Sequence, residues 1–281
     1  SRLVDIGGCG APLFFAHANG YPVGSYRQLL ETLRPQVAVT GMQQRPLWSD
    51  EPAPARLDWQ QLRDDLLETV AATQPAPVWL MGHSMGAVVA TLAGAAQPGL
   101  FRGLVLIDPV FFAPEDIRAR RALSDEVLNQ VPLVARTLTR PQTFSDHASA
   151  FAFYRPKRSF QNFTDRALQD YVEASLVPAG PEGWKLAYPP AWEAAAYRSA
   201  PEVWEALAAI RLPVLGLRGS SSDVLSEAVF KLWQEAQPHS LLRTLEGGHL
   251  LPLEHPRATA EAITAFLQQQ DQSASGAHES A

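Results

Sequence analysis

Short apolar runs recur along the chain, and longer stretches with apolar residues at helical spacing separate them. The runs that predict strands are residues 13–16, 37–40, 78–81, 104–107, 214–217 and 241–245. Residues 103–108, Gly-Leu-Val-Leu-Ile-Asp, are apolar at successive positions, which is typical of a strand that is covered on both faces. The alternation therefore predicts an α/β fold with a mostly parallel central sheet and helices on both of its faces.

Two segments between these runs have the pattern of covering helices. Within residues 57–72, Leu62, Leu66 and Val70 recur at helical spacing while charged residues occupy the other positions. Residues 200–207, Ala-Pro-Glu-Val-Trp-Glu-Ala-Leu, predict a further helix that leads into the next strand.

The regular rhythm stops after Asp108 and resumes near Ser199. We therefore predict that residues 1–109 and 200–270 form one α/β core, and that residues 110–199 are an insertion. Residues 271–281 are polar and rich in Ser and Ala, so we expect a disordered tail there.

The strongest local signal is the pentapeptide Gly82-His83-Ser84-Met85-Gly86 between an apolar strand and the apolar start of a helix. A serine exposed on a sharp strand-to-helix turn needs a strained backbone. Its flanking positions must be glycine, because the strand and the helix approach too closely for a Cβ atom. Gly82 and Gly86 meet this need, and the motif predicts that Ser84 is a nucleophile.

With this motif, the chain resembles the α/β-hydrolase superfamily over residues 12–109 and 200–268. The likeness is looser over the insertion, where that superfamily carries a variable helical cap. The resemblance implies the α/β-hydrolase fold, a nucleophile elbow and a Ser-His-Asp catalytic triad, but it implies no substrate.

Ser84 needs an imidazole to accept its proton, because a hydroxyl is a poor nucleophile at neutral pH. Of the seven histidines, His249 lies just after Gly247 and Gly248, in a loop that follows the last predicted strand. The resemblance assigns the catalytic histidine to this loop, so His249 is the predicted base. We interpret His17 and His83 as packing or loop-supporting groups.

Two aspartates are candidates for the carboxylate that orients His249. Asp223 lies in the loop after strand 214–217 and matches the usual acid of the superfamily, so we favour it. Asp108 ends strand 104–107, an alternative acid position in some members of the superfamily, and it is also explained as an anchor for the turn at Pro109.

The oxyanion of an acyl-transfer reaction needs preorganised N–H donors. The resemblance assigns one to the backbone amide of Met85 and the other to the loop after the first strong strand, where Asn19 lies at the donor position. Ala18 stands where glycine is usual, which leaves the choice between the amides of Ala18 and Asn19 open.

The amino-acid composition limits which classes of binding partner and cofactor we expect. The chain of 281 residues has 23 Lys and Arg against 29 Asp and Glu, a net charge of −6, which favours neither nucleic acid nor an anionic membrane as a partner. The single Cys9 and the absence of zinc-ligand spacing predict no metal, and the expected chemistry needs no cofactor. Residues 1–10 lack the pattern of a secretory signal, so cytoplasmic localisation is the default expectation. Nothing in the sequence specifies the oligomeric state.

The leading hypothesis is a serine esterase that hydrolyses an ester-like small molecule through a covalent acyl-enzyme. A carbon–carbon bond hydrolase or a lyase on the same triad is the close alternative. A small-molecule receptor with the same fold is the alternative from another class. The insertion is rich in aromatic residues, among them Trp184, Tyr188 and Trp192, and we expect it to cover Ser84 as a cap domain.

Overall fold

The computed structural model describes residues 1–74 and 77–279. Its main sheet has seven strands in the order β1-β3-β2-β4-β5-β9-β10. These strands are β1 (Leu3–Gly8), β2 (Ala11–Ala16), β3 (Val37–Met42), β4 (Val78–His83), β5 (Phe101–Ile107), β9 (Val214–Gly219) and β10 (Leu241–Leu245). All neighbours pair in parallel except β1, which pairs antiparallel with β3. The predicted fold class is therefore confirmed.

The strand β1 was not predicted. It lies at the edge of the sheet, it is only partly buried, and it ends in Gly7 and Gly8, both with positive φ. A half-exposed edge strand of this kind lacks the apolar run that marks the central strands, so the apolar pattern did not reveal it.

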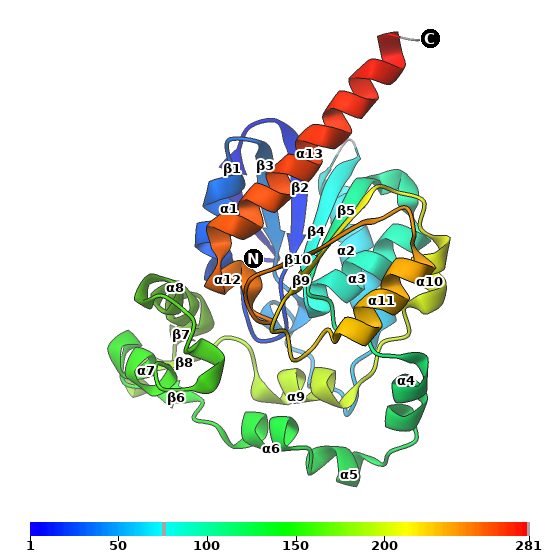
Figure 1. Cartoon of the computed structure of the whole chain (residues 1–281). Helices are drawn as coiled ribbons and strands as arrows, with labels where there is room; N and C mark the ends of the chain where they lie inside the picture. The colour runs from blue at the N-terminus through cyan, green and yellow to red at the C-terminus, as the bar shows by residue number, and fades with distance from the viewer. Residues whose placement is uncertain (75–76, 280–281) are drawn as a thin grey trace.

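Helices cover both faces of the sheet (Figure 1). The helices are α1 (Arg27–Leu33), α2 (Trp59–Thr73), α3 (Met85–Ala96), α4 (Pro114–Arg121), α5 (Asp125–Asn129), α6 (Pro132–Thr139), α7 (His147–Tyr154), α8 (Asp165–Ser175), α9 (Pro190–Arg198), α10 (Trp204–Ala209), α11 (Glu227–Ala236), α12 (Leu251–Glu254) and α13 (Pro256–Glu279). Successive residues of a strand enter opposite cores: in β2, Leu13 and Phe15 pack on the side of α1 and α13, while Phe14 packs on the side of α2 and α3. This is why the central strands are apolar at every position.

The insertion follows β5 and contains α4 to α9. It also contains a small antiparallel sheet in the order β6-β8-β7, formed by β6 (Thr143–Phe144), β7 (Leu176–Pro178) and β8 (Trp184–Leu186). We expected helices alone here, and three strands of two or three residues are too short to produce an apolar alternation. The chain has returned to the core by α10, which packs against α3.

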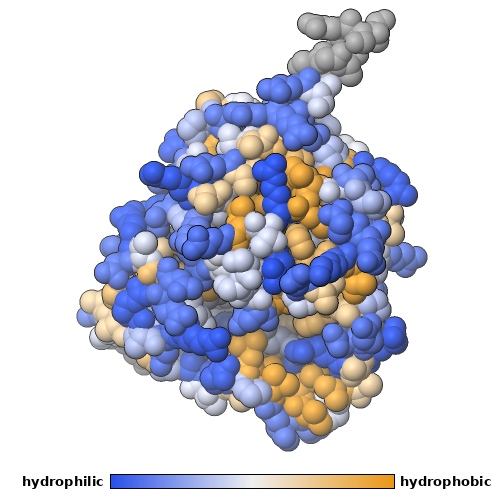
Figure 2. All heavy atoms as spheres, viewed as in Figure 1, coloured by the Kyte–Doolittle hydropathy of each residue, from blue (hydrophilic) through white to orange (hydrophobic). Residues whose placement is uncertain are grey.

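The outer face of the insertion exposes large apolar side chains. They are Leu123, Val127, Leu133 and Leu138, which lie on or beside α5 and α6. Figure 2 shows hydrophobic surface on this lower part of the molecule and further hydrophobic patches higher on the same face, between hydrophilic residues.

The C-terminal segment differs from the expected tail. Helix α13 continues through residue 279 and projects beyond the body of the protein (Figure 1). Ala and Gln, which favour helix, make up ten of its 24 residues, and Asp271 forms an ion pair with Arg102 at 3.0 Å. Residues 280 and 281 of the expected tail lie outside the described residues.

Candidate active site

Ser84 lies on the turn between β4 and α3 with φ 55° and ψ −115°, a conformation that non-glycine residues rarely adopt. The flanking glycines are required by space. A Cβ atom on Gly82 would lie 2.3 Å from the carbonyl oxygen of Gly86, and one on Gly86 would lie 2.1 Å from that of Ala16. The turn is held by a hydrogen bond from the Ser84 N–H to the carbonyl of Ile107 at 2.9 Å. The elbow geometry thus follows from the motif.

Three side chains from three segments form a hydrogen-bonded row. The Nε2 atom of His249 is 2.9 Å from the Oγ of Ser84, and its Nδ1 atom is 2.8 Å from the Oδ1 of Asp108. The ionised carboxylate only accepts, so Nδ1–H donates to Asp108 and Nε2 is left to accept the Ser84 hydroxyl proton. Asp108 is fully buried, while the His249 side chain is 18% exposed. This is the arrangement of a Ser-His-Asp triad.

This geometry corrects our preference for Asp223. Both β5 and β9 end at the same edge of the sheet, and the acid at His249 comes from the end of β5. Asp223 lies four residues beyond the end of β9 and is exposed. Its loop supports Asp108 instead, because the N–H of Gly219 donates to Oδ2 at 2.7 Å and the hydroxyl of Ser222 donates to Oδ1 at 2.6 Å.

The backbone of Asp108 also explains why it reaches the histidine. Asp108 has φ 39°, the only positive φ among the described non-glycine residues apart from Ser84. Its N–H donates to the carbonyl of Leu217 on β9 at 2.7 Å, which fixes the turn. Aspartate tolerates this region because its short side chain forms local hydrogen bonds.

The loop after β2 lies beside the elbow, and hydrogen bonds within it select one of its two candidate amides. The N–H of Ala18 donates to the hydroxyl of Tyr26 at 3.2 Å, so this amide is occupied. The N–H of Asn19 has no acceptor within the described residues. The same holds for the N–H of Met85, the first residue of α3, where the positive end of the helix dipole adds to its donor strength. The candidate oxyanion donors are therefore Asn19 and Met85, not Ala18.

The geometry is that of a known family. The sequence model described as "Alpha/beta hydrolase family" matches residues 13–262. The chain belongs to the α/β-hydrolase family.

Curated relatives differ in how much of this chain they match. Human monoglyceride lipase is 38% identical over 94 residues, which are 29% of this chain and 31% of that protein. Rat monoglyceride lipase is 31% identical over 129 residues, which are 43% of this chain and 42% of that protein. The chain thus spans less than half of the lipases it matches. The 2-(acetamidomethylene)succinate hydrolase of Mesorhizobium japonicum is 24% identical over 277 residues, 95% of each chain.

Two solved structures illustrate the shared fold. A crystal structure of E-2-(acetamidomethylene)succinate hydrolase has a TM-score of 0.79 at 24% identity, and the match covers 95% of this hydrolase and 94% of that chain. The thioesterase domain from the curacin biosynthetic pathway has a TM-score of 0.74 at 18% identity, with 94% of each chain covered. At these identities the likeness shows the fold.

Two buried histidines of the hydrolase are held neutral. His83 accepts from the Tyr26 hydroxyl through Nδ1 at 2.7 Å, so its Nε2–H donates to the carbonyl of His249 at 2.8 Å. Burial holds the pKa of His83 well below its ordinary value. Because Tyr26 also accepts from Ala18, one chain of hydrogen bonds joins the loop after β2 to the loop that carries His249. This confirms the interpretation of His83 as a supporting group.

His17 fixes the other side of the same loop. Its Nε2 accepts from the N–H of Gln44 at 2.9 Å, so its Nδ1–H donates to the carbonyl of Ala18 at 2.7 Å. Burial lowers the pKa of His17 to about 4. The N–H and the carbonyl of Ala18 therefore both form hydrogen bonds within the protein.

The insertion contacts the candidate oxyanion loop through Glu193 of α9. The side-chain amide of Asn19 donates to the backbone carbonyl of Glu193 at 3.0 Å. The Glu193 carboxylate also lies against Gly20, where a Cβ atom would be 2.9 Å from Oε2. Arg140 forms a two-pronged ion pair with this carboxylate, and the hydroxyl of Tyr197 donates to it at 3.2 Å. The ion pair thus holds the Glu193 side chain, while the backbone carbonyl of the same residue accepts from the Asn19 side chain.

The three aromatic residues singled out in the insertion have different surroundings. Trp184 of β8 meets the ring of His147 edge to face, with ring centroids 4.2 Å apart. Trp192 is buried and donates through Nε1 to the carbonyl of Glu51 in the core at 3.3 Å. Tyr188 is buried with its ring centroid 6.3 Å from that of His17, so it is the one beside the candidate oxyanion loop.

Two other features are absent from the described residues. No group of three or more His, Cys, Asp or Glu there is arranged to hold a metal ion. In the same part of the chain, no helix is both long enough and apolar enough to cross a membrane.

Proposed function

We propose that this hydrolase cleaves a carboxylic ester of a small molecule through a covalent acyl-enzyme. The single observation that carries the proposal is the row Ser84–His249–Asp108, with contacts of 2.9 and 2.8 Å on the two nitrogens of one imidazole. A serine held at a strained φ beside a base of fixed tautomer is the arrangement that nucleophilic acyl transfer needs.

The reaction proceeds in two balanced halves. Ser84 Oγ attacks the acyl carbon as His249 Nε2 takes its proton, and the amides of Asn19 and Met85 stabilise the negative oxygen of the tetrahedral intermediate. His249 then gives the proton to the departing alcohol, which leaves an acyl ester on Ser84. Water repeats the attack with the same base, releasing the acid and restoring the hydroxyl. Asp108 keeps Nδ1 protonated throughout and stabilises the transient imidazolium.

A second candidate follows from the relative that matches along its whole length. Its name describes hydrolysis of 2-(acetamidomethylene)succinate, a compound with an acetamido group. An amide passes through the same tetrahedral intermediate as an ester, with an amine in place of the alcohol as leaving group, so the same residues serve both reactions.

The test is a panel of p-nitrophenyl esters of graded acyl length beside 2-(acetamidomethylene)succinate, with Ser84→Ala as the blank. We expect wild type to release a burst of nitrophenol from at least one ester. A serine-reactive phosphonate should label Ser84, and turnover should be lost as the label is attached. Labelling of a different serine by mass spectrometry, with Ser84 unmodified, would overturn the proposal. Turnover of the acetamido compound without any ester would favour the second candidate.

A further inference from the structure

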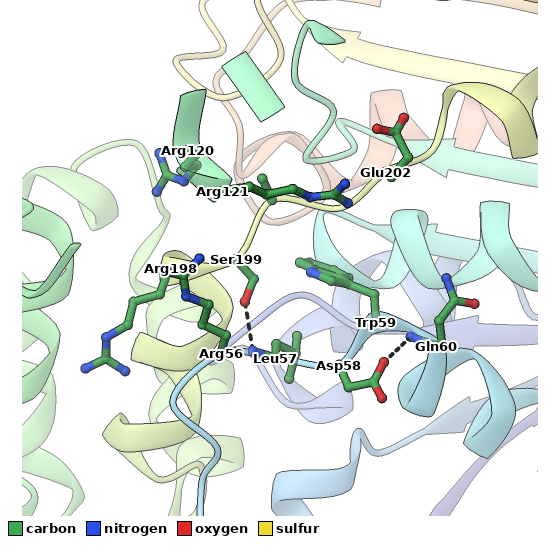
Figure 3. A pocket seen from close by; sticks show the side chains of 11 residues that line it. Arg56, Leu57, Asp58, Trp59, Gln60, Arg120, Arg121, Arg198, Ser199 and Glu202 are labelled. Carbon is green, nitrogen blue, oxygen red and sulfur yellow. Dashed lines mark hydrogen bonds between the residues drawn. The ribbon is translucent and has the colours of Figure 1, made fainter. Parts of the chain in front are cut away.

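A cavity of about 270 Å³ lies between the insertion and the core, and the triad residues do not line it. Three segments form its walls: residues 56–60 at the start of α2, the end of α4, and residues 198–202 after α9. Figure 3 shows α4 and the segment 56–60 on opposite sides of it. The cavity therefore spans the seam at which the insertion joins the core.

The lining is rich in positive charge. It has four arginines, Arg56, Arg120, Arg121 and Arg198, and two carboxylates, Asp58 and Glu202. Asp58 is engaged at the N-terminus of α2, where it accepts from two backbone amides. The only lining arginine in an ion pair within the described residues is Arg56, which binds Asp125 outside the cavity at 2.8 Å. The wall therefore keeps an excess of cationic donors.

Several of these donors have no acceptor. Arg120 donates through Nη2 to the neutral carbonyl of Tyr197 at 2.6 Å, but its Nε is buried without a partner. The Nε1 of Trp59, across the cavity, is also buried and unpartnered. Within the described residues the side chain of Arg121 has neither a hydrogen bond nor an ion pair. A buried donor without an acceptor costs roughly 1–3 kcal/mol, so the site has donors in place and lacks acceptors.

We propose that this cavity is a second ligand site, which takes the carboxylate or phosphate group of a small organic anion. Guanidinium groups suit both because their planar N–H donors match two oxygens at once. The volume far exceeds the roughly 30 Å³ of a single water, so the site has room for an anionic group together with several further atoms. Arg120 and Arg121 on the insertion and Trp59 on the core contribute the donors.

The site lies where the insertion meets the core, so an anion bound there contacts both. Because its donors come from both lobes, an anion there joins α4 to the start of α2 and stabilises the closed arrangement of the insertion over the core. Binding to one arrangement shifts the population toward it.

The test is isothermal titration calorimetry of the full chain with inorganic phosphate, pyrophosphate and citrate at constant ionic strength. The variants are Arg120→Met and Arg121→Met. Arg118→Met is the matched control, since Arg118 is an exposed arginine of the same helix that does not line the cavity. We expect wild type and Arg118→Met to bind alike, and both cavity variants to bind at least about tenfold more weakly. The affinity for citrate, compared with the affinities for phosphate and pyrophosphate, shows whether the site prefers a carboxylate or a phosphate group.

The proposal is overturned if wild type binds none of the three probes, or if Arg118→Met weakens binding as much as the cavity variants do. Arg121 is exposed, so its variant tests the site even if Arg120→Met unfolds. As an independent readout, hydrogen exchange should slow on citrate binding in residues 56–60 and α4 together. Binding is measured without turnover, so failure here leaves the proposed ester hydrolysis untouched.

Discussion

Replacing Asp108 by asparagine tests the triad geometry most directly. The backbone at 108 has φ 39°, which asparagine tolerates as aspartate does, so the turn should survive. The N–H of Gly219 donates to Oδ2 of Asp108 and demands an oxygen there. The new amide must therefore place its NH₂ group on the side of His249 and Ser222.

That orientation reverses the tautomer of His249. An NH₂ donor facing Nδ1 requires Nδ1 to accept, so the proton of the neutral His249 ring moves to Nε2, where it faces the Ser84 hydroxyl. Nε2 can then no longer accept the serine proton. The same reversal in a Ser-His-Asp protease lowers kcat by about 10⁴-fold, and we expect a loss of that order in the acylation rate.

The assay is the stopped-flow burst of nitrophenol from the best ester of the panel, with circular dichroism to confirm folding. Asp223→Asn is the matched control, because Asp223 is an exposed aspartate of the loop that supports Asp108. We expect it to keep acylation within about threefold of wild type, as surface substitutions change little. A larger loss in Asp223→Asn than in Asp108→Asn, with both variants folded, would refute this assignment of the acid.

Three further predictions follow from the surroundings of the triad. Glu193→Gln removes the negative charge that pairs with Arg140 beside the candidate oxyanion loop. The kcat on esters should therefore fall about tenfold while KM stays unchanged, as measured by steady-state kinetics. Tyr188→Leu should change the ratio of activities on long and short acyl chains while phosphonate labelling of Ser84 persists, since Tyr188 lies beside His17. Burial of His17 should lower the free energy of unfolding by about 2 kcal/mol between pH 7 and pH 5, because its pKa is about 4 when folded and 6.5 when unfolded, so only the unfolded chain takes up this proton in that range. Burial of His83 should add to the fall, and urea titrations at both pH values measure the total.

Each of these has its own control. Asp170→Asn removes a buried carboxylate that pairs with Arg27 between α8 and α1 rather than with Arg140, and an equal loss of kcat there would contradict the role given to Glu193. Trp184→Leu should leave the chain-length ratio unchanged, and the same change in both aromatic variants would contradict the assignment to Tyr188. His17→Asn should have a smaller loss of stability from pH 7 to pH 5 than wild type; an identical loss would contradict the linkage.

Much of the architecture could be read from the sequence because the signals for it are local. Central strands buried on both faces must be apolar at successive positions, as residues 104–107 are, whatever the rest of the chain does. The elbow is equally local, since Gly82 and Gly86 are required by contacts within a few residues and the neighbouring strand. His249 was also within reach, because the loop after the last strand of a parallel sheet opens at the same edge as the elbow.

The choice of acid was decided only by tertiary structure. Asp108 and Asp223 both follow strands that end at one edge of the sheet, and their order along the chain is the same relative to Ser84 and His249. The difference is made by a positive φ at Asp108, and by donors from Gly219 and Ser222 that come from more than a hundred residues away. A sequence pattern contains no record of these contacts.

The candidate oxyanion loop shows the same division. The sequence placed Ala18 and Asn19 in the right loop, but the two amides are chemically alike. The structure separates them because the hydroxyl of Tyr26 occupies the amide of Ala18, while a cap residue, Glu193, holds the side chain of Asn19. What the sequence determined about this protein is therefore the central strands, the strained serine and the histidine. Which neighbouring groups complete the site was decided by long-range hydrogen bonds that exist only once the chain has folded.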